Sequence, residues 1–169
     1  MKQDHHTGRL IISLIACLIP GYIALYLFTT SIPGWYSGLK KPGFLPSDLM
    51  VFYALILLFC LLGLSLYSIW CAGLDHNEVK AALRFFVFTL TLLMLWFASF
   101  FFLQAIFFAF VIMVMVIAMI LCTLAQILRS AVTAAFFIVP CLILMIIIGY
   151  ANLMIVELNA GLPAWGIIP

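Results

Sequence analysis

The sequence predicts an all-α integral membrane protein, a single bundle of five transmembrane helices. Of its 169 residues, 69% are hydrophobic and only 7% are charged, and its mean hydropathy is +1.39. A soluble domain carries about 25% charged residues, whereas a helix that spans a bilayer needs about 20 mostly apolar residues. The apolar length of this chain is enough for five such helices, and almost nothing remains for a soluble domain.

The charge and the cysteines exclude several classes of protein. A net charge of +2 without any basic run does not fit a nucleic-acid-binding protein. The five cysteines lie mostly within apolar stretches and show no CxxC spacing, so we expect packing residues and not a metal or redox site. The adjacent His5 and His6 and the loop residue His76 lack further ligands nearby in sequence. We therefore expect no metal and no cofactor.

The first span is predicted over residues 10–32, after a polar N-terminal tail, residues 1–9. Pro20 and Gly21 lie near the middle of this span and predict a kink that neighbouring helices must accommodate. The apolar run before Cys17 is too short for a cleaved signal segment. We therefore expect the first helix to remain in the protein.

An ordered lid is predicted over residues 33–47, where the apolar pattern is interrupted by prolines, glycines, aromatic residues and two lysines. Proline excludes a continuous helix and favours a stiff, turning connection. Trp35 and Tyr36 each combine a large apolar face with a polar tip, which suits the mouth of a ligand cavity or an aromatic belt at the membrane boundary. Composition alone leaves both interpretations open.

The second span is predicted over residues 49–71. Asp48 is a suitable N-cap for this helix, and Gly63 would allow another helix to approach it closely. The polar loop that follows ends near Lys80. This loop separates the second span from a much longer apolar segment.

Two further spans are predicted within residues 85–128. These 44 residues would form a helix of roughly 66 Å, about twice the thickness of a bilayer core, so the segment must fold back. Gln104 is the only strongly polar residue near the midpoint, which places a tight turn at residues 103–105. The third and fourth spans are then expected over residues 82–102 and 106–128.

The fifth span is predicted over residues 132–156, with a kink at Pro140. Asn152 lies within this span, where an amide needs a partner. The partner is either another helix or a bound ligand, and the sequence leaves both open. Residues 159–169 form a C-terminal tail in which Trp165 is expected to anchor at the membrane interface.

The five spans form one domain over residues 10–158 and place the chain ends on opposite sides of the membrane. One side would carry most of the basic residues, Lys2, Arg9, Lys80, Arg84 and Arg129. The other would carry only Lys40 and Lys41. The positive-inside rule then places the N-terminus in the cytoplasm and the lid outside, for a bacterial plasma membrane. Whether the bundle is a monomer or a homodimer is left open.

The lid also contains a motif, WYxxLxKPxxxP. It is formed by Trp35, Tyr36, Leu39, Lys41, Pro42 and Pro46. This motif resembles that of the TspO/MBR family, the translocator or tryptophan-rich sensory proteins, which are small five-helix membrane bundles. The family has a second proline where this chain has Ser47. Weaker similarities continue downstream, at Leu61, Leu62, Gly63, Leu95, Trp96, Phe100, Phe101, Val139, Pro140 and Asn152. The resemblance covers essentially the whole chain and favours the lid interpretation.

The chain departs from the family at positions that matter for chemistry. Two family tryptophans that line the pocket, and are associated with light-dependent porphyrin breakdown, align with Ile56 and Leu144. The third-helix asparagine of the family is replaced by Leu93, which implies a more apolar cavity. Tyr150 has no Lys or Arg after it, so a cholesterol-recognition pattern is missing.

The resemblance implies a membrane protein that binds, and transports or senses, a flat apolar ligand such as a porphyrin, another tetrapyrrole or a sterol-like molecule. Lys40 and Lys41 would attract the propionates of a porphyrin or contact lipid headgroups. The expected ligand-binding residues are Trp35, Tyr36, Leu39, Pro42, Phe44, Pro46, Trp96 and Asn152.

Two alternatives stand beside this hypothesis. A porphyrin-degrading enzyme is disfavoured because Ile56 and Leu144 cannot perform indole redox chemistry, and because no nucleophile, base and orienting acid occur together. A structural or partner-binding membrane protein, without a small-molecule ligand, would act through helix contacts alone. The expected partners are membrane lipid and the apolar ligand, with no nucleic acid and no catalytic residues.

Overall fold

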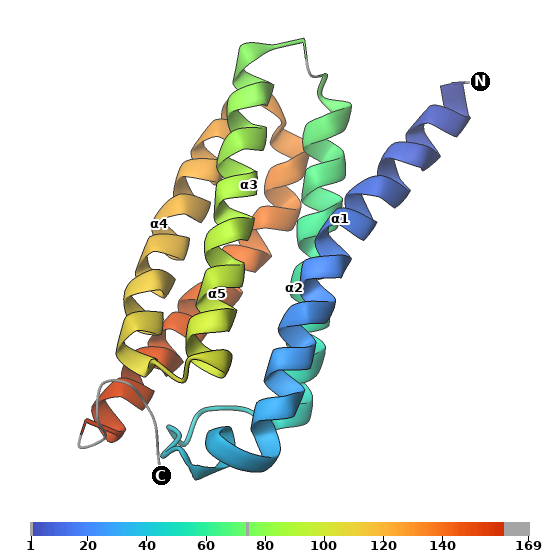
Figure 1. Cartoon of the computed structure of the whole chain (residues 1–169). Helices are drawn as coiled ribbons and strands as arrows, with labels where there is room; N and C mark the ends of the chain where they lie inside the picture. Colours follow the sequence, from blue (N-terminus) through green and yellow to red (C-terminus); the bar gives the residue numbers. More distant parts are fainter. Residues whose placement is uncertain (1, 74, 161–169) are drawn as a thin grey trace.

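The protein folds as a bundle of five long helices that run alternately up and down (Figure 1). The computed structural model describes residues 2–73 and 75–160. The helices are α1 Lys2–Ser31, α2 Asp48–Cys71, α3 Asn77–Phe97, α4 Ile106–Ser130 and α5 Val132–Leu158. Each of the five is long and apolar enough to cross a membrane. The predicted all-α membrane fold is confirmed.

The helices pack in a ring, α1 against α2, α2 against α5, α5 against α4, and α4 against α3. Large side chains fill the interior, with Phe28, Phe59 and Phe97 fully buried. The outward faces are apolar too, as at Tyr22, which is 72% exposed, and Phe136, which is 76% exposed. Exposed apolar surface of this extent is what membrane lipid covers.

Several helices begin earlier than the sequence suggested. Residues 2–9 continue α1 and do not form a separate tail, because no proline or glycine pair stops the helix there. α3 begins at Asn77, before its apolar run, with Glu78 in the first turn, where a negative charge favours the helix dipole. Asp48 is the first residue of α2 and not its cap, since Ser47 precedes the helix. Polar residues at the membrane boundary thus extend helices that hydropathy alone would shorten.

The lid, residues 33–47, is more helical than expected. A π-helical turn, η1 Ile32–Tyr36, follows α1 directly, with Pro33 in its first turn, where proline is tolerated. The backbone leaves helical angles at Gly34, with φ −129° and ψ −107°, and is helical again through residue 38. Trp35 and Tyr36 therefore lie on a kinked helical turn, and only residues 39–47 form an irregular connection to α2.

α1 and α5 both continue as helices through their internal prolines, Pro20 and Pro140. The close approach expected at Gly63 is also present, because a Cβ atom there would lie 2.9 Å from Leu14 Cδ2 on α1. Trp165 and the rest of the predicted C-terminal tail beyond Ala160 lie outside the described residues. Only Asn159 and Ala160 of that tail can be placed.

The turn between α3 and α4 lies where the sequence placed it. A second π-helical turn, η2 Ala98–Phe102, ends α3, and α4 begins at Ile106. Gln104 adopts a left-handed backbone conformation with φ +56°, which non-glycine residues rarely adopt. Gln104 thus marks the turn in two ways. It is a polar residue within an apolar segment, and its backbone conformation ends the helical path between α3 and α4.

Gln104→Gly is expected to stabilise the protein slightly. Glycine adopts positive φ at no steric cost, so the substitution should relieve about 1 kcal/mol of backbone strain. The greater entropy of the unfolded chain partly offsets this gain. A thermal unfolding scan in detergent should show an unchanged or slightly higher melting temperature. Gln104→Val should lower the melting temperature instead, because a β-branched residue is strained at this angle. An equal loss from both variants would contradict the backbone explanation.

The two ends of the bundle differ in charge as predicted. Arg9 lies near the start of α1, Arg84 in the first turns of α3, and Arg129 in the last turn of α4, so all three occupy the end opposite the lid. Arg9 also lies over the Trp70 ring at the end of α2, 5.8 Å from its centroid. Which end faces the cytoplasm remains a prediction.

Candidate functional site

A cavity of about 130 Å³ lies beneath the lid, between α2, the end of α3 and α5. Its wall is almost entirely apolar. The lining residues are Tyr36, Leu45, Pro46, Val51, Ala54, Trp96, Phe100, Phe101, Leu144, Ile147, Ile148, Ala151, Asn152 and Ile155. A concave apolar site with a few polar groups is the usual form of a small-molecule site.

Aromatic rings form one side of the cavity. The Trp96 and Phe100 rings are stacked with centroids 5.6 Å apart, and Phe101 packs edge-on against Trp96 at 6.0 Å. Tyr36, only 4% exposed, lies 5.7 Å from Phe28 and 5.8 Å from Phe101, measured between ring centroids. Such offset and edge-on pairs each add roughly 0.5–1.5 kcal/mol to the burial of the rings. η1 is thereby attached to the end of α3.

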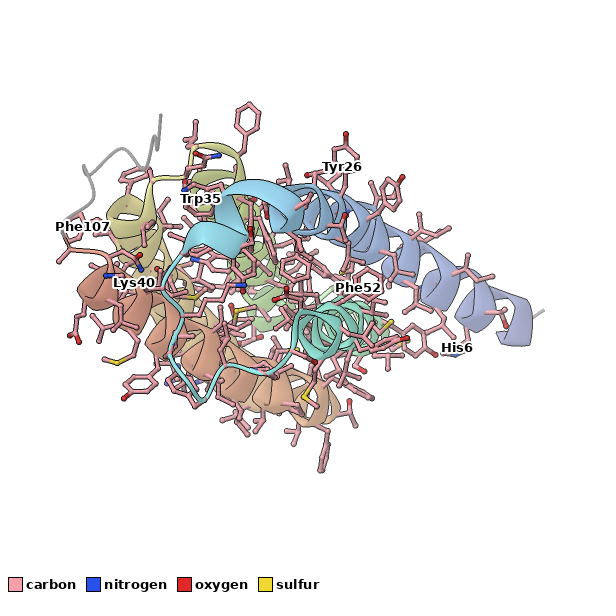
Figure 2. All side chains as sticks on the ribbon, turned by 90° about the horizontal axis from the view of Figure 1, so that it is seen from below. His6, Tyr26, Trp35, Lys40, Phe52 and Phe107 are labelled. Atoms are coloured by element: carbon pink, nitrogen blue, oxygen red, sulfur yellow. The ribbon has the colours of Figure 1, made fainter. Side chains whose placement is uncertain are left out.

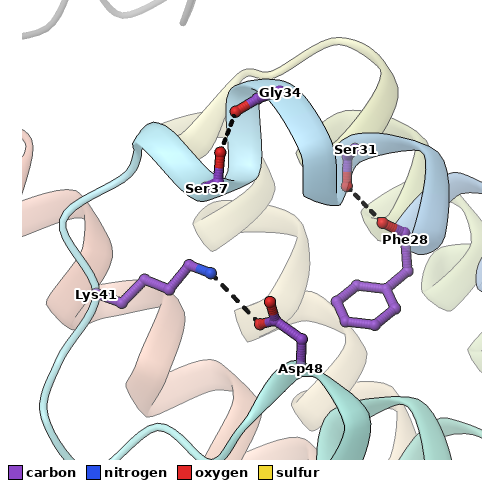
Figure 3. A network of polar contacts seen from close by, with 6 residues as sticks. All are labelled: Phe28, Ser31, Gly34, Ser37, Lys41 and Asp48. Atoms are coloured by element: carbon purple, nitrogen blue, oxygen red, sulfur yellow. Dashed lines mark hydrogen bonds and ion pairs between the residues drawn. The ribbon is translucent and has the colours of Figure 1, made fainter.

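A charged contact joins the lid to the start of α2. Lys41 Nζ lies 3.6 Å from the centroid of the Tyr36 ring and 3.4 Å from Asp48 Oδ1 (Figure 3). An ammonium over an aromatic face is attracted by the ring quadrupole, and the carboxylate balances its charge. Within the described residues Lys41 is therefore engaged with the protein, which limits its expected role of attracting a ligand carboxylate.

A pair of hydrogen bonds joins the lid to the end of α5. The backbone N–H of Lys40 donates to Asn159 Oδ1 at 3.1 Å, and Asn159 Nδ2 donates back to the Lys40 carbonyl oxygen at 3.0 Å. Asn159 Nδ2 also donates to the carbonyl oxygen of Ile155 at 2.8 Å. Seen from the lid end, the connection that carries Lys40 passes alongside α5 before it turns toward α2 (Figure 2). One side chain thus holds the middle of the lid.

Further contacts fix the two ends of the lid. Ser37 Oγ donates to the carbonyl oxygen of Gly34 at 2.7 Å, which closes the kinked turn (Figure 3). At the outer edge the Phe44 ring stacks on Tyr150 of α5, with centroids 5.2 Å apart. The lid is thus tied to α2, α3 and α5, the same elements that enclose the cavity.

Two of the cavity-lining residues carry buried polar atoms without partners among the described residues. Asn152 is 2% exposed, and neither Nδ2 nor Oδ1 has a hydrogen-bond partner among the described residues. The same holds for Nε1 of Trp96, which also lines the cavity, and for Nε1 of Trp35. The helix-to-helix hydrogen bond that we considered for Asn152 is therefore not formed within the described residues.

The predicted ligand-binding residues divide into two groups. Tyr36, Pro46, Trp96 and Asn152 line the cavity. The others, Trp35, Leu39, Pro42 and Phe44, belong to the lid but are not among the lining residues. Within this second group, Trp35 packs edge-on against Phe100 at 5.5 Å and Leu39 is buried. Phe44, in contrast, is 48% exposed. For this second group, a role in ligand binding stays a prediction.

The sequence analysis missed most of the α5 wall of the cavity. The α5 lining residues are Leu144, Ile147, Ile148, Ala151, Asn152 and Ile155. They recur at intervals of three and four, so they share one helix face. Counting from Asn152 in both directions by helical spacing would have found this face. The α2 residues Val51 and Ala54 offered no such signal.

Comparison with known proteins agrees with this architecture. The TspO/MBR family profile matches residues 13–158, which include the lid, the helices α2 to α5 and α1 from residue 13 onward. The chain belongs to the TspO/MBR family. It is 31% identical over 144 residues to the tryptophan-rich protein TspO of Chlorobaculum tepidum, an alignment that covers 85% of this chain and 90% of that protein. It is 34% identical over 96 residues to the Archaeoglobus fulgidus protein of the same name, covering 57% of this chain and 61% of the relative, less than two thirds of its length.

The positions at which the resemblance implies family tryptophans and an asparagine differ in their relation to the cavity. Leu144, where the resemblance implies a fifth-helix tryptophan, lines the cavity. Ile56, at the other family tryptophan position, is not among the lining residues, and Leu93, at the asparagine position, is buried. Of the described indoles, Trp96 is therefore the one in the cavity wall.

Proposed function

We propose that this TspO/MBR protein binds, and transports or senses, a flat apolar ligand such as a tetrapyrrole in the cavity beneath the lid. The observation that carries the proposal is the apolar cavity whose wall contains the stacked rings of Trp96 and Phe100 together with the unpartnered amide of Asn152. Aromatic faces suit a flat ring system, and an unpartnered buried amide favours a ligand with a polar group.

The volume of the cavity limits which ligands can bind without a movement of the lid. At about 130 Å³ it is smaller than the 300–1,000 Å³ of typical small-molecule sites and close to the size that holds a single benzene ring. A tetrapyrrole is much larger, so its binding requires the lid to move away from α5 and α2. The contacts of Lys40, Lys41 and Phe44 would have to open first.

A titration in lipid nanodiscs tests the proposal. Protoporphyrin should quench tryptophan fluorescence saturably in the dark, because Trp96 lies in the cavity wall. Tyr36→Ala should weaken binding about tenfold by removing ring contacts, while the lipid-facing Tyr22→Ala should bind like the wild type. Trp70→Phe, at the far end of α2, should leave the quenching amplitude from the site intact. Absence of saturable quenching in folded protein would refute the tetrapyrrole assignment.

The same titration separates two alternative functions. We expect no protein-dependent bleaching of porphyrin absorbance under light, since Leu144 stands where the family has an indole. Bleaching would instead support a porphyrin-degrading enzyme. A protein without a ligand response, whose function depends on its oligomeric state, would support a structural role.

A further inference from the structure

The side chain of Asn152 is the feature of the cavity on which this inference depends. It is buried in the last third of the span Val132–Leu158, and both atoms of its amide lack a partner among the described residues. Asn159, which directly follows the last residue of α5, forms three hydrogen bonds through its carboxamide. Of these two buried amides, the one at the cavity wall is therefore the one without partners among the described residues.

The neighbours of Asn152 cannot complete its hydrogen bonds. Around it the α5 wall consists of Ile148, Ala151 and Ile155, and the facing α2 wall of Val51 and Ala54, none of which has a polar side-chain atom. Trp96 adds one more unpartnered donor, its indole N–H. The polar side-chain groups of the wall are thus the Asn152 carboxamide, the Trp96 indole N–H and the Tyr36 hydroxyl, and the first two have no partner among the described residues.

The absence of charged side chains among the described lining residues restricts which chemical groups of a ligand can bind there. The described lining residues include no Lys, Arg or His, and the nearby Lys41 is engaged with Tyr36 and Asp48. A carboxylate or phosphate placed here would be buried without a counter-charge, which is strongly unfavourable. The wall therefore favours a neutral group, and the Asn152 carboxamide is best matched by one with both a donor and an acceptor.

We propose that the cavity recognises a flat, uncharged ligand edge with an N–H group beside a C=O group, as in a lactam or cyclic imide. Such an edge pairs with the Asn152 carboxamide through two parallel hydrogen bonds, and its carbonyl oxygen has a second lone pair for the Trp96 N–H. This inference rests on the proposed function and specifies its ligand class. A porphyrin carries its N–H groups at the centre of the ring, so a tetrapyrrole meets this requirement only if an edge ring is a lactam.

Three flat probes of similar size test the inference by equilibrium dialysis against protein in nanodiscs, corrected with empty nanodiscs. The probes are 2-quinolinone, N-methyl-2-quinolinone, which lacks the donor, and naphthalene, which lacks both groups. We expect 2-quinolinone to bind saturably and at least tenfold more tightly than the other two. Asn152→Leu, which keeps the branched shape and the number of heavy atoms of the side chain, should remove this preference, and Trp96→Phe should reduce it.

The results distinguish a failure of this inference from a failure of the proposed function. Equal binding of 2-quinolinone and its N-methyl derivative, or a preference that survives in Asn152→Leu, would overturn the inference. If protoporphyrin still quenches tryptophan saturably in that case, the proposed function stands without it. If neither protoporphyrin nor any probe binds, both are overturned. Should Asn152→Leu fail to fold, the comparison of the two quinolinones with the wild-type protein decides alone.

Discussion

Replacing Gly21 with alanine is expected to lower the free energy of unfolding by about 2 kcal/mol. A Cβ atom at this position would lie 2.7 Å from Cγ and 2.9 Å from Cβ of Phe59 on α2. Phe59 is fully buried and packs against Phe97, with ring centroids 6.1 Å apart, so its ring has no free space to enter. Overpacking of this kind costs about 3 kcal/mol, and the better helix propensity of alanine returns about 1 kcal/mol.

Gly149→Ala on α5 is the matched control for this effect. The added Cβ atom would meet Ile117 Cδ1 at 3.1 Å and Met113 Cγ at 3.2 Å, which are atoms of flexible side chains. These side chains can shift by a few tenths of an ångström, so the gain in helix propensity should offset the strain. The control isolates the contact with Phe59 because both variants make the same substitution within a helix.

Thermal unfolding in detergent, followed by circular dichroism, measures both variants. Gly21→Ala should lower the apparent melting temperature by about 6 °C, since 1 kcal/mol corresponds to about 2–4 °C in a chain of this size. Gly149→Ala should change it by less than about 2 °C. Equal changes in the two variants would show that α1 and α2 are not held at the distance that Gly21 permits.

The spans could be predicted from the sequence because the bilayer restricts the chain to a few solutions. A segment as long and apolar as residues 85–128 must fold back, and Gln104 was the one residue polar enough to mark the turn. The helix ends were less accurate. Hydropathy measures which residues enter lipid, whereas residues 2–9 and 77–81 are helical but need not lie in lipid.

The candidate site was harder to predict because its residues meet only in three dimensions. The aromatic residues and prolines of the lid indicated the end of the bundle at which the cavity lies, because they interrupt an otherwise apolar sequence. Local sequence did not show that Trp35 and Phe44 hold the lid while Tyr36 faces the cavity. The role of Asn159 was also missed, because its partner is the backbone of a residue 119 positions away.

Asn159→Ala is expected to release the lid and to speed ligand entry. The substitution removes the donor and the acceptor that pair with the backbone of Lys40, a loss of about 2 kcal/mol at roughly 1 kcal/mol for each hydrogen bond. Because a tetrapyrrole is much larger than the cavity, we expect it to bind only after the lid has moved. A shift of 2 kcal/mol toward the open lid corresponds to about a 30-fold faster association rate, measured by stopped-flow quenching with protoporphyrin.

Two further variants show which contact controls entry. Asn159→Asp keeps an oxygen that can accept from the Lys40 N–H but loses the donor to its carbonyl, so its association rate should lie between those of the wild type and Asn159→Ala. Phe44→Ala removes only the exposed stack on Tyr150 and should have a smaller effect. If Asn159→Ala lowers the melting temperature but leaves the association rate unchanged, the ligand does not pass the lid. Entry would then be from the lipid, between the helices.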